Sequence, residues 1–249
     1  MAVLITRPDE RGEQLTKMLA EAGIFAIHAP MFEIQAGGDL NELPNKLNQL
    51  KSGDYVFAVS KSAVDFAAQT LENTGFNWRK DLHFFAVGQR TAEHFACRTG
   101  AAVQFPTTQE NSEGLLDLPE MQQLAGKRIL ILRGNGGREL FPEQAQARGA
   151  EIDIAECYRR QSIDYDNVEQ TSIFIRAGIQ TIVATSAEIL TQLMEFVPAE
   201  QQDWLKNCRL ITVSQRLADL AHALGWQDVI ISAKADNQAL LQTLIAHQS

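Results

Sequence analysis

DYVFAVS at residues 54–60 returns as QTIVATS at residues 180–186, an offset of 126 residues. The same offset relates VLITR at 3–7 to ILILR at 129–133, AG at 22–23 to RG at 148–149, and VGQRTA at 87–92 to VSQRLA at 213–218. One constant offset over four segments predicts an internal repeat. A duplicated chain predicts two similar lobes, and clefts between lobes are common ligand sites.

The composition is that of a globular protein with substantial cores. Of the 249 residues, 45% are hydrophobic, and the net charge of −9 argues against general binding of nucleic acids or anionic membranes. The first residues show no signal-peptide pattern. Cys97, Cys157 and Cys208 are odd in number and widely spaced, which favours free thiols in a reducing compartment. We therefore expect a cytoplasmic protein, and a monomer because no exposed apolar stripe calls for a dimer.

Short apolar runs alternate with amphipathic segments along the whole chain. The predicted strands are Ala2–Ile5, Tyr55–Val59, Phe84–Val87, Ile129–Leu132, Thr181–Thr185, Leu210–Val213 and Val229–Ile231. The predicted helices are Arg11–Ala22, Ala63–Leu71, Arg90–Thr99, Glu113–Leu124, Glu139–Ala147, Ala187–Phe196, Leu217–Leu224 and Gln238–Ala246. This alternation predicts an α/β fold with parallel sheets, each about the size of a flavodoxin-like sheet.

Two polar connections, residues 35–39 and 159–165, occupy matching places in the two repeats. If the chain crosses between lobes at both places, the first strand–helix unit packs with the last third of the chain. The residues themselves leave open whether the lobes are swapped in this way or contiguous.

Cations, hydroxyls and amides gather where the predicted strands end, which is where ligands bind in open parallel sheets. The cations are Arg7, Lys61, Arg90, Arg133, Arg138 and Arg216, and the other groups are Thr6, Ser60, Ser62, Gln89, Thr91, Thr185, Ser186, Ser214 and Gln215. In an acidic protein this set predicts a site for carboxylates or phosphates. For any single residue, a helix cap or a solvated cation explains the pattern equally well, whereas ligand binding is favoured for the set.

Familiar catalytic patterns do not occur in the sequence. RGNGGR at 133–138 lacks both phosphate-loop spacings and is interpreted as a flexible, amide-rich turn. The five histidines show no metal-ligand spacing, and Ser60 and Ser186 lack a nucleophile elbow. Tyr158 ends a predicted strand, where it either donates a hydrogen bond to a ligand or closes a core.

Several of these segments together resemble a known family. They are the strand ending in Thr6-Arg7, DYVFAVSKSAV at 54–64, VGQRTA at 87–92, LRG at 132–134, GR at 137–138, GA at 149–150, YR at 158–159, TS at 185–186, VS at 213–214 and Gly225. Each motif is short, but their order and spacing resemble the uroporphyrinogen-III synthase family nearly from end to end.

The resemblance implies two flavodoxin-like lobes joined by a two-stranded connection. Lobe 1 would comprise residues 1–34 and 166–249, lobe 2 residues 38–158, and the crossovers residues 35–37 and 159–165. It also implies a reaction that uses neither a cofactor nor a metal. Hydroxymethylbilane, a linear tetrapyrrole, loses water, inverts its last ring through a spiro intermediate and closes to uroporphyrinogen III. Handover of this substrate from the upstream bilane-forming enzyme is the expected partnership.

The resemblance also implies residue roles. Tyr158 would be the acid that hydrogen-bonds the leaving hydroxyl. The implied binding positions are Ser60, Thr91, Ser186 and Ser214, with Arg209 where some members have a lysine. Some members have a hydroxyl side chain where this chain has Leu217, so Gln215 or Arg216 would have to replace that contact.

Two rival functions fit part of the pattern. A non-catalytic, two-lobed sensor of anions would share the repeat and the strand-end cations. Such modules are often secreted or fused to a DNA-binding domain, and the sequence shows neither feature. A duplicated signalling receiver would need paired acidic residues at the end of the first strand, where Thr6 and Arg7 stand instead.

Overall fold

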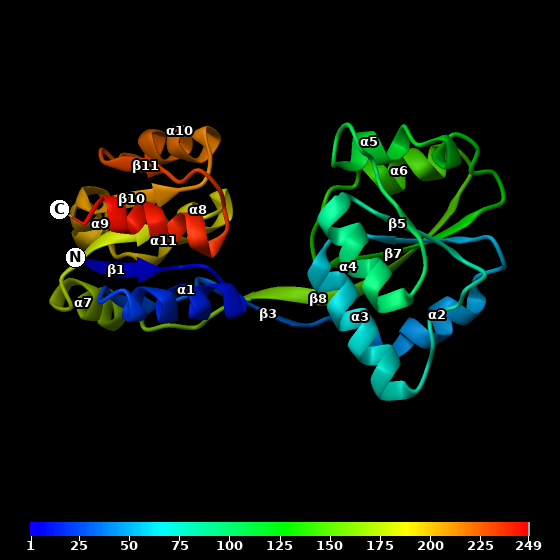
Figure 1. Ribbon diagram of the computed structural model, residues 1–249, viewed down its shortest axis with the longest axis horizontal. Helices are drawn as coiled ribbons and strands as arrows, with labels where there is room; N and C mark the ends of the chain where they lie inside the picture. Colours follow the sequence, from blue (N-terminus) through cyan, green and yellow to red (C-terminus); the bar gives the residue numbers. More distant parts are fainter. Residues whose placement is uncertain (249) are drawn as a thin grey trace. The chain divides into compact units, whose positions relative to one another are not determined.

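The computed structural model describes residues 1–248 and consists of two compact units. Unit 1 is formed by Met1–Glu33 and Gln161–Ser249, and unit 2 by Ile34–Arg160. In Figure 1, unit 1 therefore combines the blue start of the chain with its yellow-to-red end, and unit 2 is cyan to green. The boundaries expected from the sequence, 1–34 with 166–249 and 38–158, differ from these by a few residues.

Unit 1 contains a five-stranded sheet with the order β11-β10-β9-β1-β2. Every neighbouring pair is parallel. The strands are β1 (Ala2–Ile5), β2 (Phe25–His28), β9 (Ile179–Val183), β10 (Arg209–Thr212) and β11 (Val229–Ile231). The helices are α1 (Asp9–Glu21), α7 (Asn167–Arg176), α8 (Ala187–Phe196), α9 (Gln202–Asn207), α10 (Gln215–Leu224) and α11 (Asn237–Ala246). Leu15 and Leu19 of α1 share one buried cluster with Leu240 and Leu244 of α11, so the two ends of the chain pack together.

Unit 2 contains a six-stranded sheet with the order β3-β8-β7-β4-β5-β6. The strands are β3 (Phe32–Ala36), β4 (Tyr55–Ala58), β5 (His83–Ala86), β6 (Val103–Gln104), β7 (Arg128–Gly134) and β8 (Glu151–Ser162). The helices are α2 (Leu43–Gln49), α3 (Lys61–Thr74), α4 (Gln89–Thr99), α5 (Ser112–Leu116) and α6 (Leu140–Ala147). The chain enters unit 2 within β3 and leaves it near the end of β8, and these two strands are neighbours in the sheet.

Alternate residues of the central strands of unit 2 pack into two separate cores, because successive side chains of a strand point to opposite faces. Val56 and Ala58 of β4 pack in a cluster with residues of α2, α3 and α4. Tyr55 and Phe57 belong to a second cluster, with residues of α5 and α6. In Figure 1, α5 and α6 accordingly lie on one side of the sheet and α3 and α4 on the other. The predicted α/β class with parallel sheets is therefore confirmed.

Elements recur at the offset seen in the sequence. β10 begins 126 residues after β5, α8 the same distance after α3, and α10 the same distance after α4. Gly23, with φ of 73°, occupies the left-handed conformation expected of a C′ glycine after the first helix. The duplication itself stays an inference from the sequence.

Some sequence expectations were wrong. The helix predicted over residues 113–124 ends at Leu116. Proline is unfavourable inside a helix but is accepted in a first turn, and Pro119 begins a separate 3₁₀ turn at Pro119–Met121. Tyr158 does not end its strand, since β8 continues to Ser162. β2, β3, β6, α2, α7 and α9 were also not predicted, because their short or half-polar patterns give weak periodic signals.

The three cysteines are free, and the fold gives them different reactivities. Burial raises the pKa of the Cys157 and Cys208 thiols to about 12 each, whereas Cys97 is exposed. At pH 8 only about one buried thiol in ten thousand is then a thiolate, which is the reactive form.

We expect iodoacetamide to alkylate Cys97 alone in the folded chain, as measured by peptide mass spectrometry. Guanidinium-unfolded protein is the control, in which all three should react; rapid labelling of Cys157 in native protein would contradict the prediction.

Candidate functional site

The hydroxyls of Ser60 and Tyr158 meet at the carboxyl end of the unit 2 sheet, although they are 98 residues apart in sequence. Ser60 follows β4 and caps α3, where its Oγ accepts a hydrogen bond from the Ala63 N–H at 3.3 Å. The same Oγ lies 3.3 Å from the phenol oxygen of Tyr158 and donates to it. The Tyr158 proton therefore stays available for another acceptor.

The ring of Tyr158 is held in place on more than one side. It is 8% exposed and stacks with Phe66 of α3, with ring centroids 6.5 Å apart. At the end of β7, Gly134 faces the ring, and Asn135 donates its backbone N–H to the Tyr158 carbonyl at 3.0 Å. Neither role was predicted from the sequence, in which residues 133–138 have the pattern of a flexible turn. The sequence signal for Gly134 and Asn135 is their place just after the predicted strand Ile129–Leu132. Their contact with Tyr158 depends on the pairing of β7 with β8.

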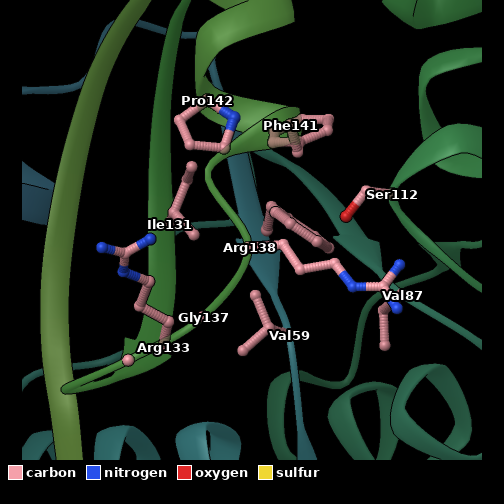
Figure 2. Close-up of a pocket in the computed structure, with 11 residues that line it drawn as sticks. Val59, Val87, Ser112, Ile131, Arg133, Gly137, Arg138, Phe141 and Pro142 are labelled. Carbon is pink, nitrogen blue, oxygen red and sulfur yellow. The ribbon is translucent and has the colours of Figure 1, made fainter.

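A small hollow opens on the other face of the unit 2 sheet, with a volume of about 170 Å³. Its floor is apolar, formed by Phe57, Val59, Val87, Ile131 and Phe141. Figure 2 shows Arg138 reaching toward Ser112 and Val87, while Arg133 extends to the opposite side.

Both arginines of the hollow have acidic neighbours. Arg133 Nη1 is 2.9 Å from Glu139 Oε1, and Arg138 Nη1 is 3.8 Å from Glu113 Oε2. The Arg133 side chain is only 17% exposed, whereas that of Arg138 is 72% exposed. Arg138 is therefore the more accessible of the two predicted anion contacts.

The other predicted residues of unit 2 lie at the first turns of two helices. Lys61 and Ser62 begin α3, and Gln89, Arg90 and Thr91 begin α4. Lys61 and Arg90 are exposed, whereas Thr91 is 8% exposed and packs in the core. Gln89 donates to Glu93 within its own helix at 2.8 Å. Together with Ser60, these residues lie beyond the carboxyl ends of β4 and β5, as expected from the sequence.

In unit 1, two serines cap helices as Ser60 does. Ser186 accepts from the Ile189 N–H at 3.2 Å, and Ser214 accepts from the Leu217 N–H at 3.4 Å. Thr185, Ser186 and Ser214 thus stand at the carboxyl ends of β9 and β10. Gln215 and Arg216 are exposed at the start of α10.

Thr6 and Arg7 are buried in unit 1 and make contacts within the fold. The Thr6 hydroxyl donates to the Val183 carbonyl at 2.6 Å, and the Arg7 guanidinium donates to the Ala235 carbonyl and to Asn237 Oδ1. These bonds connect the end of β1 to β9 and to the start of α11 with the segment before it. Packing within unit 1 accounts for both side chains.

Arg209 does not lie with Ser186 and Ser214. It begins β10, so in a parallel sheet it stands at the amino end, opposite the edge where Ser214 follows the same strand. Its guanidinium donates to Asp228 at 2.8 Å and to the His247 carbonyl at 2.7 Å. Leu217, where a hydroxyl contact is missing from the expected pattern, is 3% exposed and belongs to the core.

Comparison with known proteins agrees with the fold. A structure of a mutant uroporphyrinogen III synthase from Thermus thermophilus matches with a TM-score of 0.69, covering 100% of this chain and 99% of that chain at 16% identity. Uroporphyrinogen-III synthetase from Helicobacter pylori 26695 matches with a TM-score of 0.57, covering 98% of both chains at 15% identity. At such identities the likeness concerns the fold.

The sequence matches go further. The uroporphyrinogen-III synthase (HemD) family model matches residues 13–242. Uroporphyrinogen-III synthase of Salmonella typhimurium is 45% identical over 245 residues, which cover 98% of this chain and all of that protein. The enzyme of the same name from Escherichia coli K12 is 43% identical over the same length and coverage. These matches show that the chain belongs to the uroporphyrinogen-III synthase family.

Proposed function

We propose that this chain catalyses the closure of hydroxymethylbilane to uroporphyrinogen III, with inversion of the terminal ring and loss of water. Its membership of the family supports the reaction. The observation that supports the chemistry is the pair of Ser60 and Tyr158 hydroxyls, which meet just beyond the carboxyl end of β4. The alternative, a non-catalytic anion sensor, finds no support among the relatives.

The proposed step needs one proton donor and a controlled geometry. The hydroxymethyl group leaves easily because the lone pair of the pyrrole nitrogen stabilises the resulting cation. Tyr158 donates its proton to the departing hydroxyl. Ser60 donates to the Tyr158 oxygen at 3.3 Å, which helps to orient the phenol and leaves its proton free to be donated.

Geometry determines which isomer forms. The free substrate also closes without the enzyme, and this spontaneous closure gives the uninverted type I isomer. The protein must therefore hold the ends of the substrate so that the substituted ring carbon attacks. We propose that the strand-end serines and arginines hold the substrate carboxylates, because the net charge of −9 provides no long-range attraction.

Charge reversal at Arg138 tests this binding role. We expect Arg138→Glu to raise KM about fivefold with a smaller change in kcat, because it places a carboxylate beside an anionic substrate. Steady-state kinetics at several salt concentrations measure the effect, which should shrink as salt increases. Lys80→Glu is the matched control, since Lys80 is exposed before the amino end of β5, at the opposite edge of the sheet. An unchanged KM for Arg138→Glu would leave Arg138 as a solvated surface residue.

The function itself is tested with freshly generated hydroxymethylbilane. The products are oxidised, and the type I and type III isomers are separated chromatographically. Predominantly type III product supports the synthase. Only type I product, at the spontaneous rate and with folded protein, would rule it out.

The finer properties are also proposals. We propose that the enzyme works in the cytoplasm as a monomer without a cofactor, and that it receives its substrate from the upstream bilane-forming enzyme. None of the helices in residues 1–248 is long and apolar enough to cross a membrane.

A further inference from the structure

A bulge in β8 turns Tyr158 toward Ser60. The β7–β8 pairing matches Arg133 with Glu156 and then Gly134 with Tyr158, so that Cys157 is the extra residue. In a regular strand, residues 157 and 158 would point to opposite faces of the sheet. Here Cys157 and Tyr158 both belong to the cluster on the α3 face. Bulges re-aim side chains in this way and often occur beside active sites.

Gly134 leaves the space that the re-aimed ring fills. A Cβ atom at this position would lie 2.7 Å from both Cε2 and Cζ of Tyr158. Real Cβ atoms do not approach other heavy atoms so closely, so any side chain here displaces the ring. The ring carries the hydroxyl, whose contact with Ser60 is already long at 3.3 Å.

Asn135 clamps β8 just beyond the bulge. Its backbone N–H donates to the Tyr158 carbonyl at 3.0 Å, and its side-chain Oδ1 accepts from the Arg160 N–H at 3.1 Å. Its Nδ2 also donates to the Arg160 carbonyl at 3.4 Å. The side-chain amide thus replaces the next peptide group of β7, which has ended at Gly134. On the other side, the Gly37 N–H donates to the Cys157 carbonyl at 3.0 Å.

We propose that Gly134 and Asn135 are positioning residues, which hold the bulge so that the Tyr158 hydroxyl reaches the leaving group. The inference rests on the proposed function, and specifically on the role of Tyr158 as the proton donor. Neither Gly134 nor Asn135 is proposed to contact the substrate. A displaced hydroxyl should slow the enzymatic step without weakening binding, so that more substrate closes spontaneously.

The test is a cycle of four proteins: wild type, Gly134→Ala, Tyr158→Phe and the double variant. We expect Gly134→Ala to lower kcat about tenfold with KM nearly unchanged, and to raise the share of type I isomer. In the Tyr158→Phe background the same substitution should change kcat by less than about twofold, because the hydroxyl it displaces is already gone. Gly136→Ala is the matched control, since a Cβ there meets no atom within 4 Å, and it should behave as wild type.

Each outcome decides the matter. A wild-type kcat for Gly134→Ala, or an equal loss in both backgrounds, overturns the inference, because an equal loss indicates a general structural effect. If circular dichroism shows that Gly134→Ala does not fold, Asn135→Ala replaces it in the same cycle with the same expectations, since it removes the side-chain hydrogen bonds to Arg160 without adding volume. If Tyr158→Phe alone keeps the wild-type rate while wild type makes type III isomer, Tyr158 is not the donor and the positioning role falls with it. If wild type makes no type III isomer, the proposed function itself has failed.

Discussion

Tyr158→Phe is expected to lower turnover by severalfold to about a hundredfold, as the loss of a single proton donor does. The substitution removes one oxygen and leaves the ring that stacks on Phe66 and fills the space beside Gly134. The chain should therefore keep its fold, and the loss should appear in kcat more than in KM. Single-turnover kinetics with separation of the isomers measure it, with type I product increasing as the enzymatic rate falls.

Tyr55→Phe is the matched control for this result. The Tyr55 hydroxyl donates to the Glu120 carbonyl at 3.4 Å, and the residue is 7% exposed, much like Tyr158. It begins β4, however, so it stands at the opposite edge of the sheet from Ser60. Tyr55→Phe should keep turnover within about twofold of wild type. Wild-type turnover in Tyr158→Phe would remove Tyr158 from the mechanism.

The largest expected effect on stability is that of Phe95→Ala, a loss of about 3–5 kcal/mol in the free energy of unfolding. Phe95 of α4 is fully buried, and its ring meets Trp78 and Phe84 edge to face, with centroids 5.3 Å apart in each pair. Truncation removes a large apolar surface and two aromatic contacts, and it leaves a cavity that a close-packed core fills only in part. Urea unfolding followed by tryptophan fluorescence reports on the change, since Trp78 belongs to this cluster.

Phe25→Ala provides the comparison. Phe25 lies in β2 and is 57% exposed, so the same truncation should change the free energy of unfolding by no more than about 0.5 kcal/mol. Equal midpoints for Phe95→Ala and wild type would show that the aromatic cluster does not stabilise unit 2.

The sequence was most informative where one pattern had one physical meaning. Uninterrupted apolar runs such as residues 55–59 predicted buried parallel strands, and the structure has β4 there. Serines directly after such runs predicted either caps or ligand contacts, and Ser60, Ser186 and Ser214 all cap helices. Their binding roles stay a prediction, because a capping serine and a binding serine have the same local sequence.

The features of the fold and the site that were not predicted from the sequence depend on pairing between distant segments. No local pattern reveals that β8 bulges at Cys157, since the bulge is defined by its register against β7. Arg209 was grouped with the strand-end residues by resemblance alone, whereas its place in β10 puts it at the other edge of the sheet. The family motif could suggest Tyr158, but only the fold shows that Gly134 gives its ring room.

The discontinuity of unit 1 has a consequence for how the protein is made. β1 lies between β2 and β9 in its sheet, and β9 is translated only after the whole of unit 2 has been translated. Unit 2 can therefore fold during synthesis, while β1, α1 and β2 must wait with apolar surface uncovered. The wait lasts until α11, the last helix that the structure describes, packs against α1. A premature stop codon that removes only this helix should thus uncover part of the apolar face of α1, and quality-control proteases act on chains with such exposed surface.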